Sequence, residues 1–138
     1  MNFLLDTSAV SEWVKSCPNP GVIRWMESAD EDRVFLSVIS LAELRYGVER
    51  LPLGARRVRL EHWLRDELPL RFEGRVLSVN DEIAEAWGRT VSRSEALGRP
   101  IGAMDAFLSA TAEVHRLTLV TRNVSDFPLL KSVANPWT

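Results

Sequence analysis

Short apolar segments alternate with segments of helical periodicity along this 138-residue chain. The apolar segments are rich in branched and aromatic residues, which favours strands. They occupy residues 3–5, 34–39, 75–79 and 117–121, with a shorter edge segment beginning at Val133. Parallel strands need crossover connections, which are usually helices. The alternation therefore predicts an α/β fold, with a central parallel sheet of about four to five strands and helices on both faces. The length suits one domain, spanning residues 1–138.

Capping residues and breakers predict where the helices between these strands begin and end. Asn19 precedes Pro20, which takes a first-turn position that proline favours. Ser40 and Asn80 stand where N-caps are expected, and Pro69 is expected to end the helix before it. The predicted helices run through residues 10–14, from 20 onward, from 40 through 48, over about 55–67, from 80 through 91, and from 101 or 102 to about 116.

Acidic or amide residues stand where the apolar segments stop. Asp6, Glu43 and Asn123 follow the first, second and fourth predicted strands, and Asp105 lies in the first turns of the helix that leads to the fourth. Ligands of parallel sheets bind outside the carboxyl ends of the strands. Two carboxylates about 4 Å apart repel by roughly 4 kcal/mol at an effective dielectric constant near 20, so a cluster of them needs a cation. Mg²⁺ or Mn²⁺ prefers hard oxygen ligands and supports phosphodiester hydrolysis.

Each of these residues also has a purely structural interpretation. Asp6 before a helix fits an N-cap, and Ser40-Leu41-Ala42-Glu43 fits the S-x-x-E capping box. Asp105 near a helix start suits the helix dipole, and residues 123–126 fit an Asx turn. The joint placement of the four segments in a βα array favours a shared pocket over four separate caps.

The four segments have distinctive sequences, namely LLDTS at 4–8, SLAELRYG at 40–47, IGAMDAFLSATA at 101–112 and TRNVSDF at 121–127. In sequence and in order they resemble the PIN-domain ribonucleases, specifically the VapC and FitB type toxins of bacterial toxin–antitoxin pairs. The ending Asn135-Pro136-Trp137 is similar to FitB-type proteins in particular. By this resemblance Asp6, Glu43 and Asp105 are the metal ligands. It also makes Thr7 and Thr121 pocket hydroxyls that orient carboxylates or water.

The chain departs from this family at the fourth acidic position. Asn123 stands where many relatives carry an aspartate, and Asp126 is a carboxylate three residues further on that can stand in for it. We expect Asp126 to contribute to catalysis through water, and Asn123 to shape the turn.

The resemblance implies a PIN-like domain that cleaves RNA endonucleolytically with Mg²⁺ or Mn²⁺ as its cofactor and water as the nucleophile. It further implies a homodimer and a cognate antitoxin. The C-terminal segment of that antitoxin covers the pocket and sets an arginine near the carboxylates, while its N-terminal part binds operator DNA.

Two rival functions stay open. One is a non-catalytic PIN-like binding module, and the other is a phosphotransfer α/β domain that is phosphorylated on Asp6. Phosphotransfer domains generally carry a lysine at a later strand end, whereas the lysines of this chain are Lys15 and Lys131.

Composition excludes several other classes. Hydrophobic residues make up 46% and charged residues 26%, which argues against disorder and against a coiled coil. The chain has one cysteine, Cys17, and two histidines, His62 and His115. One copy therefore cannot assemble a disulfide framework or a Cys/His zinc site, and neither histidine is expected to be catalytic. The sequence shows no signal peptide and no run of membrane-spanning length, so we expect a cytoplasmic protein with no membrane partner.

Arginine dominates the basic residues, accounting for 15 of 17 in a chain of formal net charge −2. One stretch holds Arg56, Arg57, Arg59, Arg65 and Arg71. This stretch is either a basic flank beside the acidic pocket or a solvated helix face, and both interpretations stay open.

Overall fold

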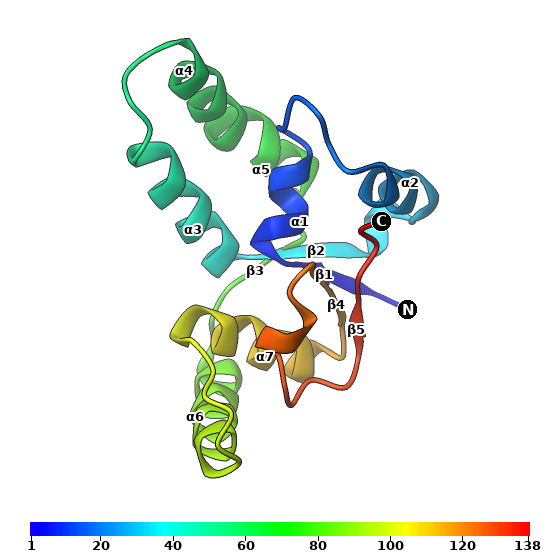
Figure 1. Cartoon of the computed structure of the whole chain (residues 1–138), viewed down its shortest axis with the longest axis vertical. Helices are drawn as coiled ribbons and strands as arrows, with labels where there is room; N and C mark the ends of the chain where they lie inside the picture. Colours follow the sequence, from blue (N-terminus) through cyan, green and yellow to red (C-terminus); the bar gives the residue numbers. More distant parts are fainter.

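The computed structural model describes all 138 residues, and its centre is a sheet of five parallel strands (Figure 1). The strands are β1 Phe3–Leu5, β2 Val34–Ser37, β3 Val76–Leu77, β4 Thr118–Val120 and β5 Val133–Ala134. Their order in the sheet is β3-β2-β1-β4-β5. The chain steps outward from β1 to β2 and β3, and then crosses back to β4 on the other side of β1. The strand order thus reverses beside β1, which is where such sheets bind ligands. The predicted parallel α/β fold is confirmed.

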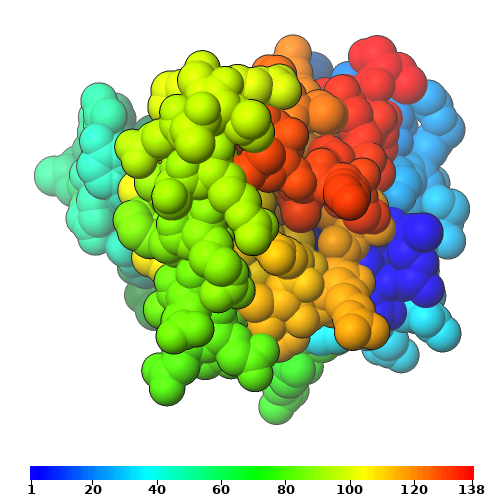
Figure 2. Space-filling view, turned by 90° about the horizontal axis from the view of Figure 1, so that it is seen from below, coloured from blue at the N-terminus to red at the C-terminus, as the bar shows by residue number.

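Helices cover both faces of the sheet (Figure 1). Their bounds are α1 Thr7–Glu12, α2 Pro20–Ser28, α3 Val38–Glu49, α4 Ala55–His62, α5 Leu68–Arg71, α6 Asp81–Ala96 and α7 Ala103–His115. Helices α1, α3, α4 and α5 lie on one side, and α6 and α7 lie on the other. In the space-filling view α6 forms much of the near face, with the orange-to-red segment that follows β4 beside it (Figure 2). None of the helices combines the length and the apolar character needed to cross a membrane.

Side chains of the central strands alternate between two cores. Leu4 and Leu119 pack with Leu108 of α7 on one face of the sheet. Leu5 and Val120 belong to the core on the opposite face, which the helices of the first half of the chain cover. Successive strand residues point to opposite faces, so apolar residues throughout β1 and β4 indicate strands buried on both sides. This burial holds the carboxyl ends of β1 and β4 at fixed positions.

The predicted start of α3 at Ser40 is wrong. The helix begins at Val38, because Ser37 is its N-cap and the Ser37 hydroxyl accepts a hydrogen bond from the N–H of Ile39 at 3.0 Å. The preceding strand is correspondingly shorter than the predicted 34–39.

The prediction that Pro69 ends a helix is also wrong. A π-helical segment, η2 (Trp63–Glu67), joins α4 to α5, and the N–H of Leu68 donates to the carbonyl of Trp63. Proline lacks an N–H, and its ring crowds the carbonyl four residues earlier in an ordinary α-helix. The wider π turn directly before Pro69 accommodates the proline, so the helical path continues to Arg71.

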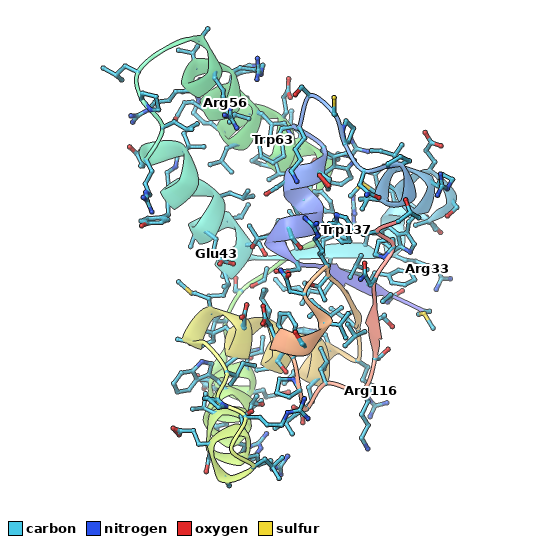
Figure 3. All side chains as sticks on the ribbon, viewed as in Figure 1. Arg33, Glu43, Arg56, Trp63, Arg116 and Trp137 are labelled. Atoms are coloured by element: carbon cyan, nitrogen blue, oxygen red, sulfur yellow. The ribbon has the colours of Figure 1, made fainter.

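The C-terminal residues return to the first part of the chain, where Trp137 lies beside α1 (Figure 3). The indole N–H of Trp137 donates to Oε1 of Glu12 at 3.2 Å. Glu12 is only 2% exposed and also pairs with Lys15 at 3.0 Å. The tail passes close over Gly21 at the start of α2, where a Cβ atom would lie 2.1 Å from the carbonyl oxygen of Pro136. Only glycine permits this approach.

Candidate functional site

The pocket at the carboxyl ends of β1 and β4 is built around Asp6. Leu5 pairs with Val120 in the sheet, so the residues that follow them, Asp6 and Thr121, lie side by side. The Thr121 hydroxyl donates to Oδ2 of Asp6 at 2.6 Å, and the N–H of Asp6 donates to the Val120 carbonyl at 2.9 Å. The sheet register therefore fixes a carboxylate at the point where the strand order reverses.

Helix α1 starts directly after Asp6, and Asp6 is its N-cap. Oδ1 of Asp6 accepts from the N–H of Thr7 at 2.7 Å, and Oδ2 accepts from the Ser8 hydroxyl at 3.2 Å. Asp6 thus caps α1 and also lies beside Thr121 at the carboxyl ends of β1 and β4. The cap orients the carboxylate that the pocket presents.

Helix α3 carries Glu43 to the same pocket (Figure 3). The Thr7 hydroxyl donates to Oε1 of Glu43 at 2.7 Å, and its oxygen lies 3.2 Å from Oγ of Ser40. Ser40 is buried inside the helix, so the capping box predicted for residues 40–43 is wrong. Glu43 faces Thr7 and does not cap its own helix.

Asp105 stands in the first turn of α7, among the other carboxylates. Burial raises the pKa of Asp105 to about 6, and repulsion from the Asp6, Asp126 and Glu43 carboxylates adds to the rise. None of the four carboxylates takes part in an ion pair. The pocket therefore concentrates negative charge that no side chain of this protein offsets.

The donor chemistry of the pocket fits a hard divalent cation, although the spacing does not form a closed coordination shell. No group of three or more Asp, Glu, His or Cys side chains is arranged to hold a metal ion directly. Mg²⁺ usually keeps several waters and contacts only one or two carboxylates in proteins. A hydrated cation among these groups would also offset the repulsion that raises the pKa of Asp105. The residues therefore fit a cation that is held partly through water.

Comparison with known proteins shows the family of this chain. A protein-family model described as PIN domain matches residues 3–129. The chain belongs to the PIN-domain family. The resemblance inferred from the four sequence segments is confirmed, and the model match extends over nearly all of the secondary structure described above.

Relatives of this PIN domain have nearly the same length. Toxin FitB of Neisseria gonorrhoeae is 36% identical over 135 residues, which cover 97% of each protein. VapC ribonuclease Y4jK of Sinorhizobium fredii is 31% identical over 135 residues, covering 97% of this chain and 96% of the relative. A solved structure described as FitAB bound to an IR36 DNA fragment has a TM-score of 0.92 at 33% identity, covering 99% of this chain and 96% of the other.

Asn123 and Asp126 lie in the turn that follows β4 of the PIN domain. The N–H of Asn123 donates to the Thr121 hydroxyl oxygen at 3.0 Å, and the N–H of Asp126 donates to the Asn123 carbonyl at 3.0 Å. The Asn123 side chain makes no capping hydrogen bond. Asp126 lies close enough to raise the pKa of Asp105. The backbone of Asn123 thus shapes the turn, and Asp126 adds charge to the pocket.

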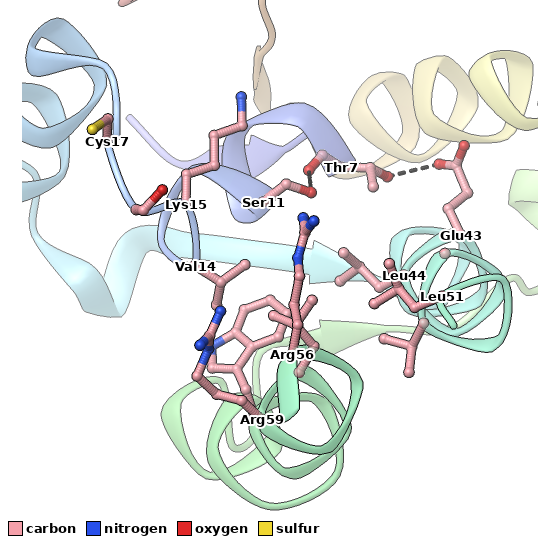
Figure 4. A pocket seen from close by; sticks show the side chains of 15 residues that line it. Thr7, Ser11, Val14, Lys15, Cys17, Glu43, Leu44, Leu51, Arg56 and Arg59 are labelled. Carbon is pink, nitrogen blue, oxygen red and sulfur yellow. Dashed lines mark hydrogen bonds between the residues drawn. The ribbon is translucent and has the colours of Figure 1, made fainter. Parts of the chain in front are cut away.

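A groove of about 900 Å³ runs from the pocket between α1, α3 and α4 of the PIN domain (Figure 4). Thr7 and Glu43 belong to both the pocket and the groove, and Lys15, Arg56 and Arg59 line the groove further along. The sequence contained one signal for the shared position of Arg56 and Arg59, because residues three apart on a helix lie on the same face. Of the two interpretations left open for this stretch, the position of Arg56 and Arg59 fits a basic flank beside the acidic pocket.

The two histidines lie outside the pocket. His62 contacts Asp66 on the surface, with Nδ1 2.9 Å from Oδ2, and His115 is the last residue of α7. Neither contacts the four carboxylates.

Proposed function

We propose that this protein is a metal-dependent endoribonuclease and the toxin of a type II toxin–antitoxin pair. The observation that carries the proposal is the pocket of four carboxylates, which have no cationic partner within the chain. The names of the relatives support the same class, since one is a toxin and another a ribonuclease.

In this proposal Asp6, Glu43 and Asp105 hold a divalent cation, Mg²⁺ or Mn²⁺, and Asp126 contributes through water. A bound divalent cation supplies a Lewis acid that activates water and neutralises charge on the scissile phosphate. The side chains of this protein orient the carboxylates that hold the cation. Thr121 and Ser8 fix the Asp6 carboxylate through hydrogen bonds of 2.6 and 3.2 Å.

We propose that the whole of residues 1–138 acts as one domain in the cytoplasm and that its partners are an RNA substrate and a cognate antitoxin. The relative described as FitAB is bound to DNA, which supports a further assembly with operator DNA through the antitoxin. A homodimer, which the family resemblance implies, remains a prediction.

Neither rival function has a specific observation in its favour. Asp6 is only 7% exposed, and both of its carboxylate oxygens accept hydrogen bonds. Such a carboxylate is poorly placed to attack a phosphoryl group. A non-catalytic module has no evident use for clustered acids, because their repulsion costs stability when no cation is bound.

The decisive variant is Asp105→Asn, which removes a metal-binding charge and conserves side-chain volume. We expect cleavage of total bacterial RNA in Mn²⁺ to fall by about 100-fold or more while circular dichroism stays unchanged. Asp32→Asn is the matched control, because Asp32 is exposed on the short 3-10 helix η1 (Glu31–Arg33) before β2 and makes no side-chain contact with the pocket. If Asp105→Asn cleaves RNA at the wild-type rate, the metal-ligand assignment is wrong. If the wild-type protein itself does not cleave, the non-catalytic module is favoured.

Two further variants assign the fourth position. Asp126→Asn should cost more activity than Asn123→Ala, because Asp126 adds charge to the pocket whereas Asn123 acts mainly through its backbone. Metal titration of both variants separates lost affinity from lost chemistry. A larger loss for Asn123→Ala would show that its side-chain carbonyl binds the cation.

A further inference from the structure

We propose that Arg56 and Arg59 bind backbone phosphates of single-stranded RNA in the groove beside the acidic pocket, and so lead the chain of nucleotides to the scissile position. This inference rests on the proposed ribonuclease function and names the residues that would hold the substrate away from the reacting phosphate.

The first observation is the position of the two arginines. Both lie on α4 and line the groove that also contains Thr7 and Glu43. The Arg56 side chain extends from α4 towards Thr7 and Ser11, and Arg59 lies beside Val14 (Figure 4). The two guanidinium groups therefore follow each other along a path that ends at the carboxylates. A nucleic-acid strand on this path would present successive phosphates to them.

The second observation is that these two arginines have no ion-pair partner, unlike the other members of the same stretch. Arg57 pairs with Glu49 at 2.8 Å, and Arg65 pairs with Asp66 at 3.1 Å. Arg71 pairs with Glu31. Arg56 and Arg59 appear in no ion pair or side-chain hydrogen bond, and both are exposed. The unpaired arginines are thus the ones that face the groove.

The third observation is the mixed lining of the groove. Apolar side chains, among them Leu44, Leu60 and Trp63, line the groove together with the charged ones. Proteins that bind single strands combine a cationic path for the backbone with apolar and aromatic surfaces for the bases. A double helix would not use such a lining, because its bases are turned inward.

Charge complementarity supports this path of the RNA strand along the groove. A phosphate placed directly at the four carboxylates is repelled unless a cation is present, whereas a phosphate at Arg56 or Arg59 is attracted. Binding in the groove therefore provides affinity that does not depend on the metal. Lys15, on another wall of the groove, is already tied to Glu12 at 3.0 Å and is less available for this role.

The test measures binding of a fluorescein-labelled, unstructured oligoribonucleotide in chelator, where the proposed chemistry cannot occur. The double variant Arg56→Ala/Arg59→Ala should bind about 10-fold more weakly than the wild-type protein. The slope of log K against log salt should fall in magnitude by about 1.4, since each single-strand phosphate contact contributes about 0.7. The double variant Arg56→Lys/Arg59→Lys keeps both charges and should retain most of the salt slope.

Arg93→Ala is the matched control. Arg93 is also an exposed helical arginine without an ion pair, but it lies on α6, on the opposite side of the sheet from α4. This variant should bind RNA as the wild-type protein does. Circular dichroism of all variants checks that the helices are intact.

The outcomes separate this inference from the proposed function. Wild-type affinity in Arg56→Ala/Arg59→Ala, or no RNA binding by the wild-type protein, overturns the inference even if Mn²⁺-dependent cleavage is observed. Arginine-dependent binding without any cleavage overturns the proposed ribonuclease activity and leaves the groove as an RNA-binding site. If the double alanine variant binds RNA normally but no longer binds the cognate antitoxin, the groove is a protein-docking surface and the RNA assignment is wrong.

Discussion

Asp6 shows how single residues from distant parts of the sequence define one functional group. Its carboxylate accepts hydrogen bonds from Thr7, Ser8 and Thr121, which lie in two of the four sequence segments. Two of the donors follow Asp6 directly, and the third arrives through the pairing of β1 with β4. The carboxylate is held in one orientation before any cation binds.

Substitution of Thr121 tests this orientation. Thr121→Val keeps the shape of the side chain but removes the hydroxyl that donates to Asp6 and accepts from the N–H of Asn123. We expect about a 10- to 100-fold loss of metal affinity or cleavage, as for other residues that orient metal ligands. The free energy of unfolding should fall by about 1–3 kcal/mol, because the buried carboxylate of Asp6 loses a hydrogen-bond donor. Metal titration and urea unfolding measure the two effects.

Thr118→Val is the control for this experiment. Thr118 is likewise a buried threonine, at the start of β4, and its hydroxyl lies 2.7 Å from that of Ser132, away from the pocket. It should lose similar stability and keep its metal affinity. Equal losses of affinity in both variants would mean that Thr121 acts only through the fold.

Asp6, Glu43 and Asn123 could be predicted at one edge of the sheet because each follows an apolar run typical of a strand, and Asp105 because it begins the helix that leads to the fourth strand. Asp6 and Thr121 could be predicted as neighbours once β1 and β4 were taken to be parallel. The lack of an ion-pair partner at Arg56 and Arg59 could not be predicted. It depends on which carboxylates, such as Glu49 for Arg57, come within reach after folding.

At the scale of elements, α6 packs against the start of α7. Trp87 of α6 stacks on Phe107 with ring centroids 5.3 Å apart, and its indole N–H donates to the carbonyl of Ala103 at 3.0 Å. Ala103 is the first residue of α7, two positions before Asp105. The helix that carries Asp105 is therefore anchored at its start by a neighbouring helix.

Trp87→Phe removes this hydrogen bond and retains an aromatic ring. We expect a loss of about 1 kcal/mol in the free energy of unfolding and a metal affinity several-fold weaker, because Asp105 is less firmly placed. Trp25→Phe provides the comparison. Trp25 of α2 packs edge-on against Phe3 of β1 and lies away from the pocket. That control should lower stability alone. Unchanged metal affinity in Trp87→Phe would show that α7 needs no anchor from α6.

Helix boundaries were predicted less well than the helices themselves, for local reasons. Ser37 and Ser40 both suit an N-cap, and the choice between them depends on where β2 leaves the sheet. Pro69 is an ordinary helix breaker by sequence. Its tolerance depends on the π turn of η2, which involves the packing of Trp63 and Leu64 in the core and leaves no recognisable pattern in the sequence.

At the scale of the whole molecule, metal binding and protonation compete for the same pocket. Because the folded pKa of Asp105 is raised from 3.8 to about 6, its contribution to metal-free stability is fully present below the lower value. That contribution is lost as the pH rises through about 6. A cation binds the charged form, so metal stabilises the folded state more at higher pH.

We expect Mg²⁺ or Mn²⁺ to raise the melting temperature, and to raise it more at about pH 7 than at about pH 5. At 100 times the dissociation constant the stabilisation is about 2.7 kcal/mol. Thermal unfolding with metal and with chelator at both pH values measures the effect. Asp105→Asn should show a smaller metal shift and a weaker pH dependence. A melting temperature indifferent to millimolar metal at either pH would contradict the cation site.

Both edges of the central sheet are very short, since β3 and β5 contain two residues each. An exposed edge strand can pair with a strand from another chain, either in a regulated complex or in an aggregate. Here neither edge presents a run of free backbone groups long enough to template such pairing. We therefore expect a protein partner to recognise side chains instead of extending the sheet, so its specificity can diverge without any change to the strands that hold the carboxylates.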